Sequence, residues 1–248
     1  MRRIGVVVPA RDEEELVERC LHSVMRAAQA AQAAGSPGVG GVVGAAAGAA
    51  AGAEVVVVLV ADGCSDRTAA IARSVPGVEV LVFPAVGVGA AREFGARRAI
   101  AAGCSWIACT DADSEVPPGW LVEQLRLESL GWDAMIGSVR PSFADLSTLE
   151  EEHWVATHHP GHPNGHVHGA NLGVRTASFV RVGGFRSLTE HEDNDLVDRL
   201  RAAGAWLIAS DAVEVTTSGR HLGRTTGGYA GHLRRIAAML GDMDPATV

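Results

Sequence analysis

Short runs of β-branched residues alternate with helix-like segments through the first 140 residues, and this alternation restricts the fold more than any other feature. The run Val55–Val60 has no polar interruption, as expected of a strand buried on both faces. The expected strands are 4–8, 55–60, 78–83, 106–110 and 134–139, and the expected helices are 65–74, 89–102 and one opened by Pro117-Pro118. Such alternation predicts right-handed crossovers and an α/β fold around a Rossmann-like, mostly parallel sheet.

Polar residues directly follow three of the expected strands. The three segments are Pro9-Ala10-Arg11, Asp62-Gly63 and Asp111-Ala112-Asp113. Ligands of open parallel sheets bind beyond the carboxyl ends of the strands. The three segments therefore predict one ligand-binding rim.

Asp111 and Asp113 flank a single small residue, so an extended chain would point both carboxylates the same way. Two hard oxygen ligands suit Mg²⁺ or Mn²⁺ and leave positions open for phosphate oxygens. Such a cation would offset the charge that builds on a nucleoside-diphosphate leaving group. A solvated turn with an Asp helix cap is the simpler alternative.

Two other residues near the strand ends could contact a nucleotide. Asp62 could accept a ring N–H of uracil or guanine, although an Asp-Gly turn explains it equally well. Arg92 lies near an expected helix start, where it could reach a base or diphosphate, or could be an ordinary surface arginine.

Glu192-Asp193 precedes an expected helix at 195–203. One interpretation is a helix cap. The other is a general base that takes the proton of an acceptor hydroxyl, on the face opposite the leaving group. The residues alone leave both open.

Six of the ten histidines lie between residues 153 and 168, with spacings that match no standard zinc pattern. We expect this segment to be a loop in which one or two histidines are useful. His221, after Ser218-Gly219-Arg220, is a better candidate for a third metal ligand or a diphosphate contact.

Composition excludes several classes of protein. A formal net charge of −8 with scattered arginines argues against a nucleic-acid partner. The four cysteines form no C-x-x-C pair, which favours reduced thiols and a cytoplasmic location, with Cys20 and Cys104 in the core. No uninterrupted apolar run is long enough for a transmembrane segment, and the N-terminal run is too short for a signal peptide.

Two further expectations concern local structure. Asp12, with Glu15 three residues later, predicts a capped helix start. Residues 29–53 are almost all small and of low complexity, and they predict an insertion with a loop around Gly35-Ser36-Pro37-Gly38. A last helix is expected over 232–240.

Taken in order, these segments resemble the family 2 glycosyltransferases of the GT-A fold. Val7–Glu14 resembles the family's opening strand and nucleotide loop, and Val60–Thr68 resembles its Asp-Asp-Gly-Ser-x-Asp segment, with Ala61 in place of the first Asp. The other similar segments are Ala91-Arg92-Glu93 (Glu for the usual Asn), Asp111-Ala112-Asp113, Gly169–Arg175 with Gly183-Gly184-Phe185, Glu192–Leu196 and Thr217-Ser218-Gly219-Arg220.

The resemblance implies a single GT-A domain over 1–248, with a nucleotide-sugar half over about 1–140 and a mixed acceptor half over about 141–248. It implies hexosyl transfer from a UDP- or GDP-sugar with inversion, with Asp193 as the general base and Glu192 beside it. Asp113, Asp111 and His221 would hold Mg²⁺ or Mn²⁺. The expected donor contacts are Pro9, Ala10, Arg11, Glu13, Asp62, Arg92, Asp111 and Ala112.

Several alternatives stay open. Retaining transfer of the glucosyl-phosphoglycerate synthase type would also use the Asp pair and a late His. A nucleotidyltransferase would need a Gly-rich basic loop after the first strand, where this chain has Ala10-Arg11-Asp12-Glu13. A non-catalytic sugar-nucleotide-binding module would not need Asp113 and Asp193. The expected acceptor is a small soluble molecule, and a homodimer is compatible with the sequence.

Overall fold

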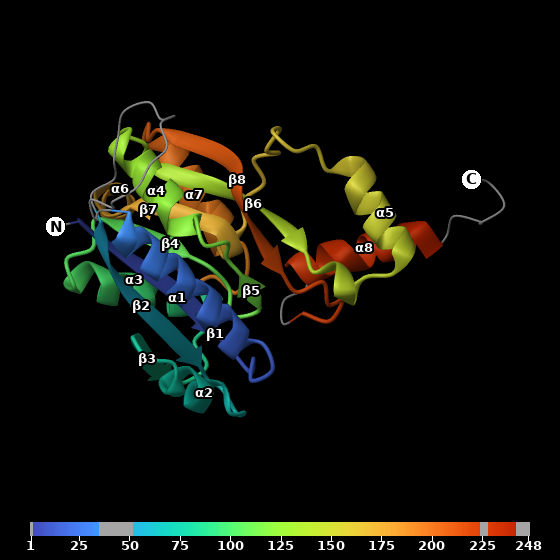
Figure 1. Cartoon of the computed structure of the whole chain (residues 1–248), viewed down its shortest axis with the longest axis horizontal. Helices are drawn as coiled ribbons and strands as arrows, with labels where there is room; N and C mark the ends of the chain where they lie inside the picture. Colours follow the sequence, from blue (N-terminus) through green and yellow to red (C-terminus); the bar gives the residue numbers. More distant parts are fainter. Residues whose placement is uncertain (1, 35–51, 224–227, 242–248) are drawn as a thin grey trace.

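One eight-stranded sheet organises the part of the chain that the computed structural model describes, residues 2–34, 52–223 and 228–241. The strand order is β3-β2-β1-β4-β7-β6-β8-β5 (Figure 1). The strands are β1 Arg2–Ala10, β2 Ala53–Asp62, β3 Val78–Phe83, β4 Trp106–Cys109, β5 Ser114–Glu115, β6 Ala134–Pro141, β7 Leu172–Arg175 and β8 Leu207–Thr217.

The sheet has a parallel half and a mixed half. Strands β3, β2, β1 and β4 run parallel, and Val7 on β1 lies opposite both Val58 and Cys109. Strand β7 then runs antiparallel to β4 and β6, while β8 is parallel to β6 and antiparallel to β5. This arrangement confirms the predicted α/β class with a mostly parallel first half and a mixed second half.

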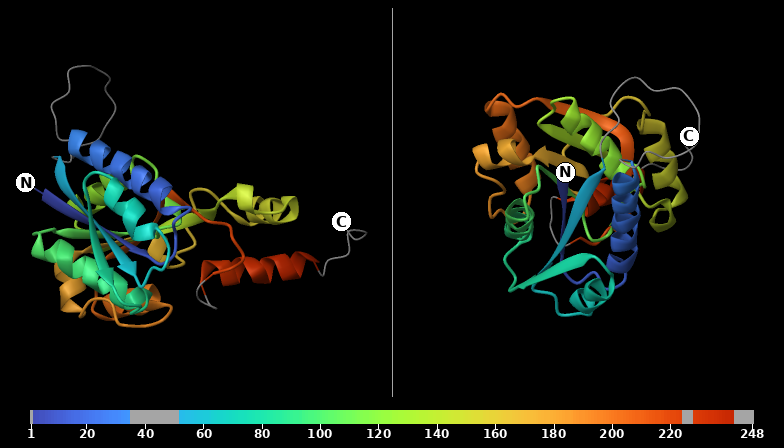
Figure 2. Two further views of the ribbon diagram at one scale, coloured as in Figure 1. Left: turned by 90° about the horizontal axis from the view of Figure 1, so that it is seen from below. Right: turned by 60° about the vertical axis from the view of Figure 1, so that its left-hand side comes forward.

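Helices cover both faces of the sheet (Figure 2). Because side chains of a strand alternate between faces, Val6 and Val8 of β1 pack with α1 and α4, whereas Val7 packs with α3 and α7. The helices are α1 Val17–Ala33, α2 Thr68–Ser74, α3 Val88–Ala101, α4 Trp120–Ser129, α5 Thr148–Thr157, α6 Thr176–Arg181, α7 Glu192–Ala202 and α8 Tyr229–Gly241, with 3₁₀ turns at Phe143–Asp145 and Gly169–Asn171.

Small residues let α3 approach the sheet closely. A Cβ at Gly95 would lie 2.5 Å from Val7 Cγ1, and one at Gly5 would lie 2.4 Å from the Cβ of Ala99. Both distances are far below van der Waals contact. Ala and Gly therefore fill this layer, which explains how a chain with 4% aromatic residues builds a continuous core.

A buried asparagine ties the second half of the sheet together. Asn171 accepts a hydrogen bond from Trp120 Nε1 at 2.8 Å and donates to the carbonyls of Ser138 and Val213 at 2.8 and 2.9 Å. These bonds connect α4, β6 and β8 to the Gly169–Asn171 turn. The turn that follows the histidine-rich segment is thereby fixed against the sheet.

The predicted cap at Asp12 is wrong. Helix α1 begins at Val17, and its N-cap Leu16 receives no side-chain hydrogen bond. Asp12 instead adopts a left-handed conformation with φ of 50°, and its carboxylate accepts bonds from the Ser65 amide and hydroxyl. Helix α1 continues to Ala33, and the loop expected around Gly35–Gly38 lies outside the described residues.

Helices α5 and α8 pack against each other away from the helices that cover the sheet (Figures 1 and 2). Helix α5 is opened by a capping box between Ser147 and Glu150. All four cysteines carry free thiols, and Cys20 and Cys104 are buried as predicted. None of the described helices is long and apolar enough to cross a bilayer.

Candidate active site

The carboxyl ends of three neighbouring parallel strands form the rim predicted from the sequence. Ala10 and Asp62 are the last residues of β1 and β2, and β4 ends two residues before Asp111. Ala10 and Ala112 are buried in the core, Pro9 is half-buried and Arg11 is exposed. Of these four, only Arg11 presents its side chain fully to solvent.

Asp62 fixes the loop that follows β3. Its two carboxylate oxygens accept the backbone N–H groups of Val86 and Gly87 at 2.6 and 3.1 Å. The residue is almost fully buried. Each oxygen still has a further lone pair, so Asp62 can accept another donor only where that donor enters the same buried space.

Arg92 of α3 joins the segment after β4 to the start of α7, a hundred residues further along the chain than Arg92 itself. Its guanidinium forms ion pairs with Asp111, after β4, and with Glu192, the first residue of α7. Arg92 and Glu192 are 4% and 3% exposed, whereas the Asp111 side chain is 35% exposed. Burial lowers the pKa of Arg92, but the carboxylates of Asp111 and Asp193 outweigh it and raise the pKa overall.

A second arginine pairs with the other aspartate of the pair. Arg220 donates to both carboxylate oxygens of Glu13 at 2.8 and 2.6 Å and to Asp113 Oδ2 at 2.9 Å. Glu13 lies in the loop after β1 and Arg220 in the segment after β8, so this cluster connects those two segments. Burial and the nearby Asp111 raise the pKa of Asp113 to about 6 despite Arg220.

Asp193 lies within electrostatic reach of Arg92. Its Oδ2 accepts the Gly169 N–H at 2.7 Å, and its Oδ1 accepts both N–H groups of Asn194, at 2.8 and 3.1 Å. His168 lies close enough for Asp193 to act on it electrostatically. Burial lowers the pKa of His168 to about 4, and Asp193 opposes that shift. The histidine is therefore neutral at pH 7.

His221 forms a carboxylate–histidine pair. Its Nε2 lies 2.6 Å from Glu150 Oε1, while Glu150 Oε2 accepts the backbone and hydroxyl groups of Ser147. Metal-ligating histidines commonly use one ring nitrogen for a carboxylate and the other for the metal. Nδ1 of His221 is the nitrogen that this pairing leaves.

The family model described as glycosyl transferase family 2 matches residues 5–180, well over half of the chain. The chain belongs to glycosyl transferase family 2. It is therefore a glycosyltransferase, as the resemblance of its motifs predicted. No curated protein matches it by sequence.

Solved structures share the fold of this family 2 glycosyltransferase. S. aureus TarS 1–349 in complex with UDP-GlcNAc superposes with a TM-score of 0.62 at 16% identity, over 99% of this chain and 69% of that one. The mannosyltransferase PcManGT from Pyrobaculum calidifontis, in complex with GDP-Man and Mn²⁺, gives 0.62 at 17% identity, over 98% and 66%. The chain spans 41% of the longer S. aureus TarS structure. These superpositions establish a common GT-A fold.

Sequence reasoning missed Arg220 as a site residue of the glycosyltransferase. The tail segment Thr217-Ser218-Gly219-Arg220 was expected near the diphosphate, but the residue after it, His221, was chosen as the candidate ligand. Arg220 contacts Asp113 and Glu13 directly. Its place in the tail segment expected near the diphosphate was the available signal, whereas its pairing with Glu13 and Asp113 forms only in the folded chain.

The histidine-rich segment forms no metal site within the described ranges. There, the one group of three potential ligands close enough for a shared ion is Asp12, Cys64 and Asp66. Asp12 already accepts bonds from Ser65, and Asp66 from the Glu14 amide and Thr68. These bonds explain the cluster as a link between the loops after β1 and β2.

Proposed function

We propose that the chain transfers a hexosyl group from a UDP- or GDP-sugar to an acceptor hydroxyl with inversion. Asp193 acts as the general base, and Glu192 holds the Arg92 guanidinium by an ion pair. Asp111 and Asp113 would hold a divalent cation. The observation that carries the proposal is the Arg92 bridge, because it fixes the Asp pair and the Glu-Asp motif in one site.

The side chains around Asp113 suit a hard divalent cation. Among the residues that the structure describes, Asp113 Oδ1 has two long hydroxyl contacts, Ser114 at 3.3 Å and Thr217 at 3.4 Å. Burial first, and then the negative charge of Asp111 and Glu13, raises the pKa of Asp113 although Arg220 opposes the shift. Asp113 and Asp111 would hold Mg²⁺ or Mn²⁺, which would offset the charge on the departing nucleoside diphosphate. Asp111, Asp113 and His221 would have to come closer together for His221 Nδ1 to be a third ligand, because they are not among the described groups of three with ligand atoms within 4.8 Å of one another.

The proton transfer follows from the contacts of Asp193. Gly169 and Asn194 hold its carboxylate by three N–H groups, so its orientation is set before substrate binds. Asp193 takes the proton of the acceptor hydroxyl while the acceptor oxygen bonds to the anomeric carbon. The bond from that carbon to the diphosphate breaks in the same step, and its electron pair leaves with the diphosphate.

The donor contacts come from the rim. Asp62 receives a ring N–H of the base, and the loop at 84–87 that it anchors forms one wall of the base site. Pro9, Ala10, Arg11, Glu13 and Ala112 line the approach to the diphosphate. The Arg92 guanidinium is paired with Asp111 and Glu192, so in this proposal it positions Asp111 beside the donor.

We assign donor and acceptor binding to the two halves of the chain. Residues 1–140 supply the nucleotide-sugar half and 141–248 the acceptor half. The acceptor is a small soluble molecule. Four free thiols fit a reducing compartment such as the cytoplasm.

A melting-temperature panel tests the proposal. Purified protein is heated with UDP- and GDP-sugars, with and without Mn²⁺ or Mg²⁺, in wild-type and Asp113→Asn forms. One donor should raise the wild-type melting temperature only when metal is present, because a ligand of the folded state stabilises it. The Asp113→Asn variant should lose that metal dependence. If no nucleotide sugar shifts the wild type, or if the variant keeps the metal-dependent shift, the proposed donor site is wrong.

A further inference from the structure

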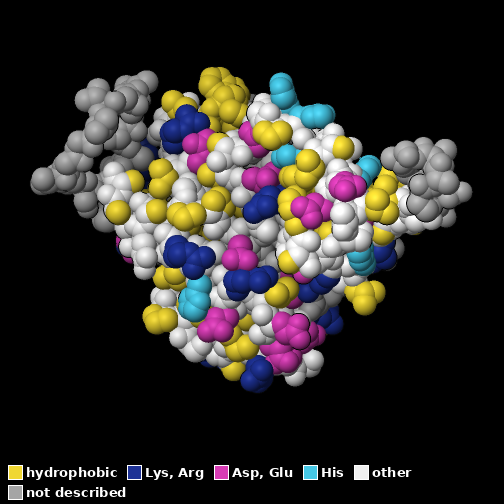
Figure 3. Space-filling model, turned by 45° about the vertical axis from the view of Figure 1, so that its right-hand side comes forward, with side chains coloured by type: hydrophobic (Ala, Val, Ile, Leu, Met, Phe, Trp, Pro, Cys, Tyr) yellow, Lys and Arg dark blue, Asp and Glu magenta, His cyan; other side chains and the backbone are white. Residues whose placement is uncertain are grey.

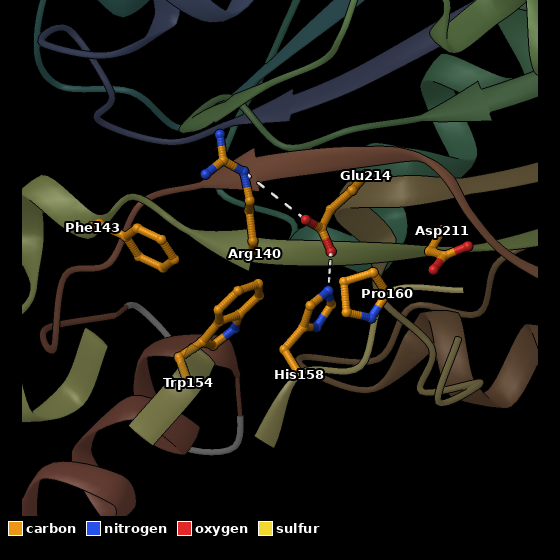
Figure 4. Close-up of a pocket in the computed structure, with 7 residues that line it drawn as sticks. All are labelled: Arg140, Phe143, Trp154, His158, Pro160, Asp211 and Glu214. Carbon is orange, nitrogen blue, oxygen red and sulfur yellow. Dashed lines mark ion pairs between the residues drawn. The ribbon is translucent and has the colours of Figure 1, made fainter. Parts of the chain in front are cut away.

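A cavity lies in the mixed half of the fold. The proposed donor contacts lie on other segments of the chain. The volume of the cavity is about 350 Å³, near the lower end of the range for small-molecule sites. Figure 4 shows its lining, which comes from β6, the first 3₁₀ turn, α5 and the loop after it, and β8: Arg140, Phe143, Trp154, His158, Pro160, Asp211 and Glu214.

Three rings form an aromatic corner in this cavity. Trp154 stacks on His158 with centroids 4.1 Å apart, and Phe143 meets Trp154 edge to face at 5.2 Å. The Arg140 guanidinium lies over the Phe143 ring at 5.8 Å. Such surfaces combine a flat apolar body with polar edges, which suits the C–H face of a ring that also carries hydroxyls.

The polar groups of the cavity are mixed in sign. Arg140 lies 4.0 Å from Glu214, and His158 Nε2 lies 3.2 Å from Glu214 Oε1. That buried oxygen has no aligned hydrogen-bond donor among the described residues. With two carboxylates against one guanidinium, the cavity disfavours a phosphate. A hydroxyl both donates and accepts, so a neutral polyhydroxylated ligand matches this set.

A line of contacts connects the cavity to the proposed base. The Trp154 indole N–H lies close enough to the Tyr229 oxygen of α8 to act as a donor toward it, and the Tyr229 ring meets that of His168 edge to face at 5.9 Å. Gly169, the residue after His168, donates its backbone N–H to Asp193 Oδ2 at 2.7 Å. The cavity is therefore on the side of the site where the base would meet an acceptor. On the face in Figure 3, acidic and basic side chains are interspersed without a basic stripe.

We propose that this cavity binds the acceptor of the glycosyl transfer, and that the acceptor presents a neutral hexose ring. The ring packs on Trp154 and Phe143, and its hydroxyls bond to Glu214, Asp211 and Arg140. This inference rests on the proposed function, since it names the substrate class of the same transferase. It adds that acceptor recognition is carbohydrate stacking and does not use an anionic group.

Ligand-observed NMR on the full chain tests the proposal. The probes are the methyl glycosides of glucose, galactose, mannose and N-acetylglucosamine and their 1,4-linked disaccharides, without donor. At least one should bind wild type and the control Trp206→Ala, whose indole is 66% exposed outside the cavity. Trp154→Ala should weaken that binding by about tenfold or more. Glu214→Gln, which keeps the side-chain shape, should weaken it with an unchanged melting temperature.

Each outcome separates this proposal from the proposed function. Binding lost in Trp154→Ala and Glu214→Gln but kept in Trp206→Ala supports the cavity as the acceptor site. The proposal is overturned if no hexoside binds, if both cavity variants bind like wild type, or if UDP or GDP displaces the hexoside. A metal-dependent melting shift with a nucleotide sugar tests the donor site independently, so a wild type that shows this shift but binds no hexoside would refute only the acceptor assignment.

Discussion

Replacing Arg92 by methionine tests whether the buried bridge holds the active site together. The change keeps an apolar stem of similar length and removes the charge that pairs with Asp111 and Glu192. Glu192 is 3% exposed, so its carboxylate would be buried without a partner, whereas Asp111 is 35% exposed and keeps water. Breaking a buried ion pair by removing one partner costs about 3–5 kcal/mol. That is a large share of a typical folding free energy of about 5–15 kcal/mol.

Urea unfolding followed by circular dichroism measures this loss. Arg98→Met is the matched control, because Arg98 lies on the same helix and forms a half-exposed pair with Glu79. It should lose less than about 1 kcal/mol. In Arg92→Met/Glu192→Gln the buried charge is gone, so the double variant should lose less than the sum of the two single variants, by about 1–3 kcal/mol. Equal losses in Arg92→Met and Arg98→Met would refute the bridge.

Two further changes probe the surroundings of Asp193. Burial lowers the pKa of His168 from its ordinary value of 6.5 to about 4; Asp193 opposes this shift, and His166 and His232 add to it. The unfolded chain therefore binds more protons than the folded chain between pH 6.5 and 4. Stability should therefore fall as the pH drops through that range, by up to roughly 3 kcal/mol, and His168→Gln should flatten the fall; an unchanged profile would contradict this. Gly169→Ala would place a Cβ 2.2 Å from Arg92 Nη2, so it should destabilise the fold by about 1–3 kcal/mol in urea unfolding. Gly119→Ala, whose Cβ would make only an ordinary contact with Val213 Cγ1 at 4.0 Å, is its control, and equal stability of the two variants would disprove the close packing.

The parallel half of the fold was predictable because β1, β4 and most of β2 are buried, and β3 is a half-buried Val-rich run. The Val-rich runs of β1, β2 and β3 lie where their sequence patterns indicate, with β3 at its predicted bounds Val78–Phe83. The rim followed from strand ends alone, since the order of adjacent parallel strands brings Ala10, Asp62 and Asp111 to one edge.

The mixed half lacked such signals. Strand β8 contains Ser210-Asp211 and is mostly half-buried, with a register shift opposite Gly137/Val139, so no periodic pattern marks it. Helix α5 buries only Glu150 and has no apolar stripe. Its capping box, Ser147-x-x-Glu150, was a readable start signal that was not used.

The partners of the site residues depend on tertiary contacts. Sequence spacing placed Arg92 near a helix start but could not show that its guanidinium is buried between Asp111 and Glu192. The pairing of Arg220 with Glu13 joins residues 207 positions apart. Such contacts arise only when both halves of the sheet are assembled.

Release of nucleoside diphosphate from the donor that the melting panel identifies tests the central claim most directly. Rates are compared for wild type, Asp193→Asn and the control Asp198→Asn, whose carboxylate is 72% exposed on the same helix. Asp193→Asn should remain folded, bind the donor with metal, and release product about 10²–10⁴-fold more slowly, because it cannot take the proton. Asp198→Asn should match wild type. Wild-type rates in a folded Asp193→Asn variant would contradict the mechanism.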